Sequence, residues 1–339
     1  MPRTKFGIRL FNFVPNGAKK ARSDWDVYSE TAIMAQRLGY DKISMSDHFF
    51  WSRRILRWAD TLGAYDHHLF PPAQLELWTT LSSISQLVPK VGLVSHVNSV
   101  NFRPPSLVAK ISSSLDVISG GRLEVGVGTG GDINETTAYG YPDPGTPTQK
   151  AERLTEFIDI LKMMWTRRSS TYIGHYYSVK GAVCYPKPLQ KPHPPLNIAG
   201  RHPATVAVAA KYADIYTPLL HCGTKEQLGP LKLLLSSFAL EVDKAGRSRK
   251  NNEIEKTAVF KLLLAKNRNE LEGKLKLWLP LGVARTDYMR WNLCATPEEC
   301  VERYGEYIDA GVNTFLIDFL DAPTMEGMKL FAWDVIKKL

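Results

Sequence analysis

The chain of 339 residues is predicted to be an α/β protein, a (β/α)8 TIM barrel with insertions at the C-terminal face. Apolar, strand-like runs alternate with helix-period segments along almost the whole sequence, and eight of these runs have the character of strands. Barrels of this kind commonly exceed about 250 residues as one unit, so the length fits a single domain. We therefore predict one domain over 1–339, with insertion segments at about 49–74, 171–195 and 266–295.

Four strand–helix units fill the first half of the chain. The predicted strands lie at 5–13, 41–50, 90–97 and 122–128. The predicted helices lie at 26–40, 76–88, 106–118 and 150–165. The first helix is expected to end at Gly39, because glycine readily adopts the left-handed conformation that often closes a helix. An alternation of strand and helix is typical of a parallel sheet.

One segment, 171–195, interrupts this alternation before four more strands follow. It begins with a hairpin-like pattern and continues through repeated prolines, and we interpret it as an excursion over the barrel mouth. The remaining strands are predicted at 196–200, 213–218, 256–265 and 313–320. The hydrophilic run at 243–256 is interpreted as a helix end and loop.

The charge balance bears on the kind of partner. The chain has 43 Lys and Arg against 34 Asp and Glu, a formal net charge of +9. These basic residues are dispersed and form no arginine-rich arm, so nucleic-acid binding is not expected. An acidic small ligand or a polyanionic cofactor tail would account for the excess.

Cysteine spacing and hydropathy indicate the compartment. No apolar run approaches the roughly 18 residues of a membrane span, and the start, "MPRTKFGIRLFNF", lacks the pattern of a signal peptide. A cytoplasmic protein without a membrane partner is expected. The cysteines are scattered and form no C-x-x-C pair, which argues against a metal site or a disulfide framework and for free thiols. They are Cys184, Cys222, Cys294 and Cys300.

The stretch "EVGVGTGGDINE" at 124–135 is rich in glycine directly after a predicted strand. Gly126, Gly128 and Gly131 match G-x-G-x-x-G, the dinucleotide fingerprint of a Rossmann fold. That fingerprint belongs in the first strand–helix turn, with an acid about 20 residues later at the end of the second strand. Here it follows the fourth strand, and the acid at that distance, Glu152, falls inside a predicted helix. The loop is therefore assigned to the C-terminal face of a barrel, where active sites are built.

Five segments at predicted strand ends together resemble a known family. They are "SDHFF" (46–50), "VSHVNSVNFRPPSLVAK" (94–110), "DVISGGRLEVGVGTGGDINE" (116–135), "YYSVKGAVCYPKPLQKPHPPLNIAG" (176–200) and "ATPEECVERYGEYIDAGVNTFLI" (295–317). In this order the chain resembles the bacterial luciferase-like superfamily, particularly its coenzyme F420 (deazaflavin) dependent oxidoreductases. The resemblance implies coenzyme F420 as cofactor, with FMN as the alternative, its ring lying across the barrel mouth. It also implies a small-molecule substrate and a homodimer.

Asp47 and His48 are the predicted catalytic residues. In the functional interpretation Asp47 holds the cofactor ring, and His48 faces the substrate, where an imidazole can pass a proton beside a hydride. The alternative is a polar pair that caps a strand. The resemblance further implies that the bond between His96 and Val97 is a non-prolyl cis peptide against the back of the ring, with Asn98 beside it.

Two further groups are predicted to bind the cofactor. Backbone N–H groups of the glycine loop and a helix start would bind the ribityl chain and phosphate, and a second anion seat would follow strand five. The alternatives are that the glycine loop is only a tight turn and that Arg201 is only a surface charge. The residues are Gly128, Thr129, Gly130 and Asn134 in the first group and Ala199, Gly200 and Arg201 in the second.

Three details leave the substrate open. Relatives that oxidise glucose 6-phosphate carry a catalytic glutamate directly after G-T-G, whereas this chain has Gly131 there, with Asp132 beside it. Arg103 is either a phosphate contact or half of a structural pair. Aromatic residues of the long loop are either a substrate wall or ordinary loop packing. They are Trp51, Trp58, Tyr65, His67 and His68.

The main hypothesis is an F420-dependent oxidoreductase that transfers a hydride between the deazaflavin and an alcohol, a carbonyl or an activated alkene. The second is a luciferase-like monooxygenase that uses reduced FMN and O2. The third is a non-catalytic flavin-binding barrel, against which the polar groups at the strand ends argue.

Overall fold

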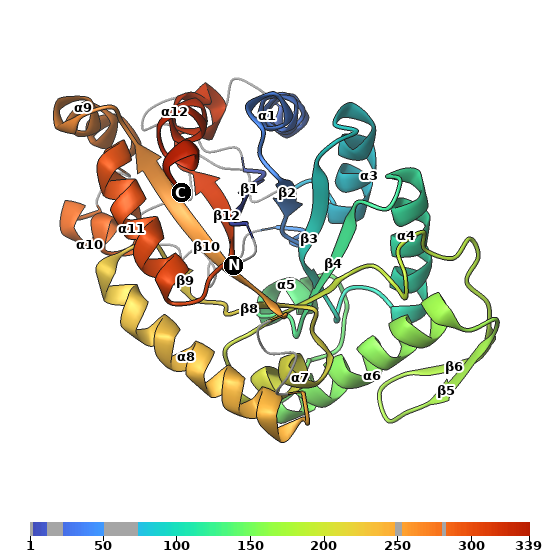
Figure 1. Ribbon diagram of the computed structural model, residues 1–339. Coiled ribbons are helices and arrows are strands. Elements are labelled where there is room, and N and C mark those ends of the chain that lie inside the picture. The colour runs from blue at the N-terminus through green and yellow to red at the C-terminus, as the bar shows by residue number, and fades with distance from the viewer. Residues whose placement is uncertain (1–2, 12–22, 51–73, 248–252, 280–282) are drawn as a thin grey trace.

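The computed structural model describes residues 3–11, 23–50, 74–247, 253–279 and 283–339. Eight parallel strands form a barrel inside a ring of helices (Figure 1). These strands are β1 (Lys5–Arg9), β2 (Lys42–Met45), β3 (Gly92–Ser99), β4 (Leu123–Gly128), β7 (Leu196–Ala199), β8 (Ile215–Thr217), β10 (Glu255–Leu264) and β12 (Thr314–Phe319). Their order around the barrel follows the chain, and pairing of β10 with β8 closes it. The predicted TIM barrel is confirmed.

Helices surround the barrel and return the chain from one end of the strands to the other. They are α1 (Asp24–Leu38), α3 (Leu77–Leu87), α4 (Pro105–Ile118), α5 (Ile133–Ala138), α6 (Pro147–Thr166), α7 (Pro203–Tyr212), α8 (Lys225–Lys244), α9 (Arg268–Trp278), α10 (Arg285–Trp291), α11 (Pro297–Asp309) and α12 (Glu326–Asp334). As predicted, α1 closes at Gly39, where φ is 81°. Thr146 and Gln149 form a capping box that starts α6.

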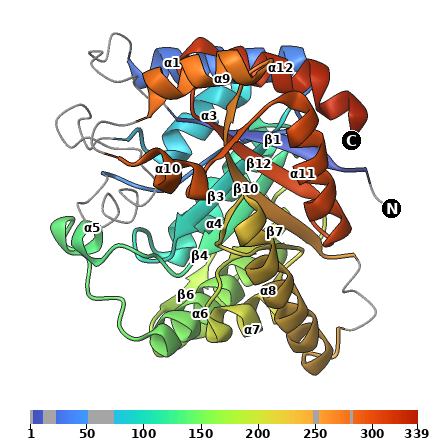
Figure 2. The same cartoon turned by 90° about the vertical axis from the view of Figure 1, so that its left-hand side faces the viewer.

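Two very short strands extend the sheet beside β10: β9 (His221–Cys222) and β11 (Leu293–Ala295). β11 pairs with the last residues of β10, so α9 and α10, which connect the two strands, lie at the C-terminal end of β10. In the side view α5 and α10 project from the C-terminal face, opposite the end where β1 begins (Figure 2).

The hydrophobic core lies between the strands and the helices. Phe260 of β10, Tyr304 of α11 and Phe315 of β12 pack together, with ring centroids of Phe260 and Tyr304 4.4 Å apart. A smaller apolar cluster, which includes Leu263, Leu275 and Tyr288, supports the C-terminal face beside β10.

Charged side chains, rather than apolar ones, fill the N-terminal end of the barrel interior. Lys42 Nζ donates to Glu124 Oε2 at 2.7 Å and to Glu255 Oε1 at 2.6 Å. Asn197 donates to the other oxygen of Glu124 at 2.7 Å. Burial lowers the pKa of Lys42, but the charges and hydrogen bonds of the two carboxylates outweigh it and raise the value overall. We call Lys42, Glu124, Asn197 and Glu255 the barrel floor.

The segment 171–195 differs from the predicted excursion over the mouth. Its hairpin, β5 (Ser170–Ile173) and β6 (Ser178–Ala182), lies along the outside of α6. Glu156 of α6 accepts the N–H groups of His175, Tyr176 and Tyr177 at 2.7–2.9 Å and so holds the turn. The Tyr177 hydroxyl reaches the loop beyond β3, where it donates to Val100 O at 2.9 Å.

Among the helices that the structure describes, none is both long and apolar enough to span a bilayer. All four cysteines are buried free thiols, as predicted.

Candidate functional site

The predicted site residues gather along one arc of the barrel mouth. In the register of the sheet, Ser99 of β3 lies opposite Gly128 of β4, which lies opposite Ala199 of β7. Asp47, just past β2, accepts the N–H of Ser99 at 3.0 Å. The ends of β2, β3, β4 and β7 therefore form one contiguous surface.

Asp47 forms a buried ion pair with Arg103. Its two oxygens accept from the two terminal nitrogens of Arg103 at 2.7 and 3.0 Å, and Arg103 also contacts Glu76 and lies 5.7 Å from the Phe49 ring centroid. Burial raises the pKa of Asp47, with the hydrogen bonds of Arg103 acting in the opposite direction. Arg103 is thus half of a structural pair, and a phosphate contact by Arg103 stays a prediction. Asp47 fixes the loop that follows β3.

His48 points to a different partner. Its Nδ1 lies 2.8 Å from Oε2 of Glu135 on α5, and Glu135 is only 1% exposed. The other oxygen of Glu135 accepts the N–H groups of Phe49 and, at 3.4 Å, Phe50. Sequence reasoning missed Glu135 although it closes the glycine-rich stretch, because a helix of six residues is too short to show a buried face.

The bond between His96 and Val97 is cis, as predicted. The pairing of β3 with β4 is irregular between Ser95 and Asn98, and the Val97 side chain projects toward β4. A Cβ on Gly128 would lie 2.8 Å from Cγ2 of Val97, and one on Gly126 would lie 2.0 Å from Ser95 O. These two glycines are therefore required by the packing of β3 on β4.

His96 is buried beneath the mouth, where neither ring nitrogen has a partner among the described residues. Burial, together with the positive charges of Arg9 and Lys42, lowers its pKa to about 3. His96 is therefore a neutral imidazole at physiological pH. Asn98 is also buried, and its Oδ1 accepts from Trp78 Nε1 at 3.0 Å.

The glycine loop ends in two unlike glycines. Gly130 has φ of 72°, and a Cβ there would lie 2.3 Å from Nδ2 of Asn101, which donates to Thr129 O at 3.2 Å. A Cβ on Gly131 would meet no heavy atom within 4 Å. The loop is a tight turn at Gly130 and open at Gly131.

The helix after this loop is too short to be an anion site of its own. Asp132 caps α5 by accepting the N–H of Asn134 at 3.0 Å, and Asn134 is exposed. Asp132 is buried, with one oxygen lacking a partner within the described part of the chain. Binding of the cofactor phosphate by the backbone N–H groups of 129–131 stays a prediction.

After β7, the loop at 199–201 lies beside the glycine loop. A Cβ on Gly200 would lie 2.4 Å from Cγ2 of Thr205, so packing of α7 already requires this glycine. Arg201 is exposed and has no hydrogen bond or ion pair with the described residues. Between the glycine loop and the loop at 199–201, Arg201 is the positively charged side chain that a ligand can reach.

Three basic residues that precede β7 lie at the N-terminal end of the barrel rather than at its mouth. Lys187 Nζ donates to Met164 O at 2.6 Å, and Lys191 Nζ donates to Pro188 O at 2.9 Å. Both residues, with His193, precede β7 and therefore lie near its N-terminal end.

Charged side chains also lie on β1, β12 and β10, the three strands that follow one another on the other side of β2 from β3. Arg9 donates to Asp318 Oδ2 at 2.9 Å, and Lys261 lies opposite Asp318 in the register of β10 and β12. Burial lowers the pKa of Lys261 to about 8, partly offset by Asp318.

Aromatic rings flank His48. Phe49 lies 4.5 Å from Phe102 and 4.3 Å from Tyr139 between ring centroids, and Tyr139 is 53% exposed. The predicted aromatic wall lies outside the described residues: Trp51, Trp58, Tyr65, His67 and His68.

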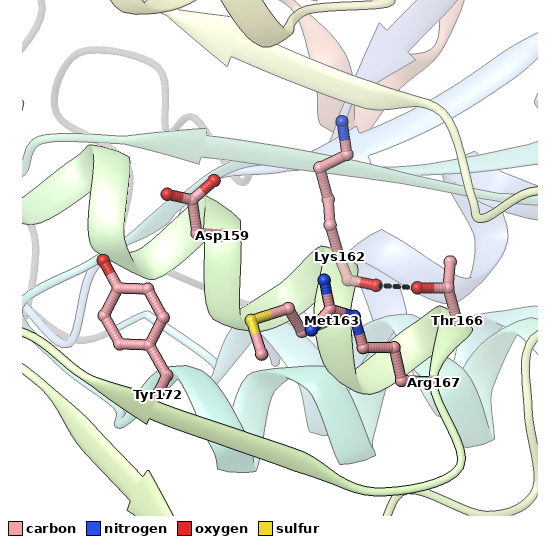
Figure 3. A pocket seen from close by; sticks show the side chains of 6 residues that line it. All are labelled: Asp159, Lys162, Met163, Thr166, Arg167 and Tyr172. Carbon is pink, nitrogen blue, oxygen red and sulfur yellow. Dashed lines mark hydrogen bonds between the residues drawn. The ribbon is translucent and has the colours of Figure 1, made fainter.

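A pocket of about 340 Å³ lies beside the last turns of α6 (Figure 3). Its lining residues are Asp159, Lys162, Met163, Thr166, Arg167 and Tyr172. Because α6 starts on the mouth side, these last turns lie at the opposite end of the barrel, and this pocket is separate from the candidate site. Across the described residues, no cluster of three metal-ligating side chains occurs.

A family model described as luciferase-like monooxygenase matches residues 4–288. The chain is 26% identical over 330 residues to an F420-dependent glucose-6-phosphate dehydrogenase of Microbacterium testaceum (strain StLB037), covering 91% of each chain. It is similar in structure to an F420-dependent secondary alcohol dehydrogenase in complex with an F420-acetone adduct, with a TM-score of 0.76, 18% identity and 98% of both chains covered. The oxygenating constituent of 3,6-diketocamphane monooxygenase of Pseudomonas putida, in complex with FMN, gives a TM-score of 0.74 at 14% identity over 99% of both chains. At these identities the two structures establish the shared fold.

Proposed function

The chain belongs to the luciferase-like monooxygenase family, and from that premise we propose that it is an F420-dependent oxidoreductase acting on a small alcohol, carbonyl compound or activated alkene. The observation that carries the proposal is the imidazole of His48, held by Glu135 at the barrel mouth. The F420-dependent names of the relative from M. testaceum and of the alcohol dehydrogenase support this choice of cofactor.

The residues of the mouth fit such a cofactor in three respects. The backbone at Gly131 is open, since a Cβ there would meet nothing within 4 Å. Asn101, behind the loop, has a buried Oδ1 that lacks a partner among the described residues. Arg201 offers an exposed positive charge for a phosphate or an acidic tail.

Each residue then has a role in the proposed reaction. When bound, F420 would supply the hydride donor or acceptor at C5 of its ring. Asp47, held by Arg103, keeps the loop after β3 in place. His48 accepts the hydroxyl proton of an alcohol, or returns it in the reverse direction. The aromatic group around Phe49 limits access of water on this side.

An FMN-dependent monooxygenase is the second candidate, favoured by the fold shared with the FMN-bound camphane monooxygenase constituent. A titration of both cofactors at low and high salt separates the two. Deazaflavin binding that weakens with salt supports the proposal, because exposed charges such as Arg201 are screened beyond about 10 Å at 0.1 M. Tight FMN binding without deazaflavin binding would replace it with the monooxygenase.

Replacing His48 tests the chemistry. His48→Ala should lower turnover about 10²–10⁴-fold, the usual loss for a positioned acid or base, and leave cofactor affinity nearly unchanged. His175→Ala, in the hairpin turn, is the matched control and should retain full turnover. Full turnover in the His48 variant would remove His48 from the reaction.

A cytoplasmic homodimer also stays part of this proposal. Light scattering would test the oligomeric state, and cell fractionation would test the localisation.

A further inference from the structure

Glu135 and His48 form a pair that the sequence separates by 87 positions. The pair joins α5 to the segment after β2 through the 2.8 Å contact of Oε2 with Nδ1. At 1% exposed, Glu135 is almost completely removed from water, whereas the His48 side chain is 25% exposed. The contact therefore lies on the protein side of the imidazole, and the ring's opposite edge is directed away from the carboxylate.

The hydrogen-bonding capacity of the two groups restricts the proton position. An ionised carboxylate only accepts, and its other oxygen, Oε1, is already directed at the N–H groups of Phe49 and Phe50. When Glu135 accepts in the bond to His48, as a carboxylate does, the proton lies on Nδ1. In the neutral imidazole this leaves the lone pair on Nε2, the nitrogen that points away from Glu135.

We infer that Glu135 is a positioning residue that fixes the Nδ1–H tautomer of His48, so that Nε2 is the atom that exchanges the substrate proton. The inference rests on the proposed function for what is transferred: the O–H proton of an alcohol moves to Nε2 while its C–H hydride leaves for the cofactor, and a carbonyl forms. The resulting imidazolium donates Nδ1–H to the carboxylate, whose charge stabilises it.

The tautomer can be measured without cofactor or substrate. Long-range ¹H–¹⁵N spectra of ¹⁵N-histidine-labelled protein, with His48→Ala to assign the signal, should show Nδ1–H in the wild type. In Glu135→Gln the amide keeps an oxygen for the N–H groups of Phe49 and Phe50 and directs an NH₂ donor at Nδ1, so the proton should move to Nε2. The same tautomer in both proteins would overturn the inference.

Kinetics test whether Glu135 acts through His48. Glu135→Gln should lower turnover about 10²–10⁴-fold, shift its pH dependence and leave cofactor affinity within about two-fold. In a His48→Ala background the same change should cost nothing further, because residues that act as a unit are not additive. Losses that multiply in the double variant would show that Glu135 acts independently of His48 and overturn the inference.

Glu156→Gln is the matched control, since Glu156 also accepts several backbone N–H groups but holds a hairpin away from His48. It should leave the pH dependence of turnover and the His48 tautomer unchanged. If the wild type transfers no hydride with F420, the proposed function fails, and the tautomer comparison still decides the role of Glu135.

Discussion

The two last glycines of the glycine loop should respond oppositely to the same added methyl group. Gly130→Ala puts a side chain on a residue with φ of 72°, which costs roughly 1–2 kcal/mol for a residue other than glycine. The new Cβ would also lie 2.3 Å from Asn101 Nδ2, so the bond from Asn101 to Thr129 O is lost at about 1 kcal/mol. The free energy of unfolding should therefore fall by about 2–3 kcal/mol.

Gly131→Ala meets none of these obstacles, because no heavy atom lies within 4 Å of its Cβ. Its free energy of unfolding should stay within about 0.5 kcal/mol of the wild type, or rise slightly because alanine restricts the unfolded chain.

Thermal unfolding without cofactor separates the two variants. With an unfolding entropy of about 2.1 cal/mol/K per residue over 339 residues, a loss of 2–3 kcal/mol lowers Tm by about 3–4 °C. Gly130→Ala should show this shift, and Gly131→Ala should show less than about 1 °C. Equal shifts in the two variants would refute the assignment of Gly130 to the turn and of Gly131 to the open side of the loop.

Three further predictions concern buried charges. Burial disfavours the ionised form of Glu255, but the charge of Lys42 outweighs burial and lowers the pKa of Glu255 to about 2. Acid titration should therefore lower the free energy of unfolding by up to about 3 kcal/mol between pH 4.5 and 2. Glu255→Gln should remove this dependence on pH. Burial lowers the pKa of Lys261 to about 8, so stability should rise by up to about 3 kcal/mol between pH 8 and 10.5, a rise that Lys261→Met should abolish in denaturant titrations. Arg103→Leu leaves Asp47 buried without its partner and should lower the free energy of unfolding at pH 7 by about 3–5 kcal/mol, whereas an unchanged value would show that the pair contributes nothing.

The barrel could be predicted because its signals are local. Each strand is an apolar run and each helix has its own period, so eight units could be counted without knowing any long-range contact. The elements that the sequence pattern did not reveal, such as α5, α10 and β11, have three to seven residues, too few for a period to appear. The hairpin was predicted, but its position along α6 depends on Glu156, a contact that no local pattern shows.

The sequence predicted which residues belong to the candidate site, but not which side chains they contact. Asp47 and His48 are adjacent in sequence, yet one side chain turns to Arg103 and the other to Glu135. Both partners lie more than fifty residues away, and only the adjacency of strand ends brings them close. The sequence also did not show that Val97 packs on Gly128 and Thr205 on Gly200, and the contacts of these glycines with a cofactor stay predictions.

The barrel floor has a consequence for the order in which ligands come and go. Lys42, Glu124 and Asn197 are buried and joined across the barrel interior, so the axis is filled below the mouth. A site with a single entrance holds two ligands as a stack, and the one bound deeper must arrive first and leave last. Steady-state kinetics should then be ordered rather than random, with the deeper product competing with the deeper substrate, and with the outer product competing with neither substrate.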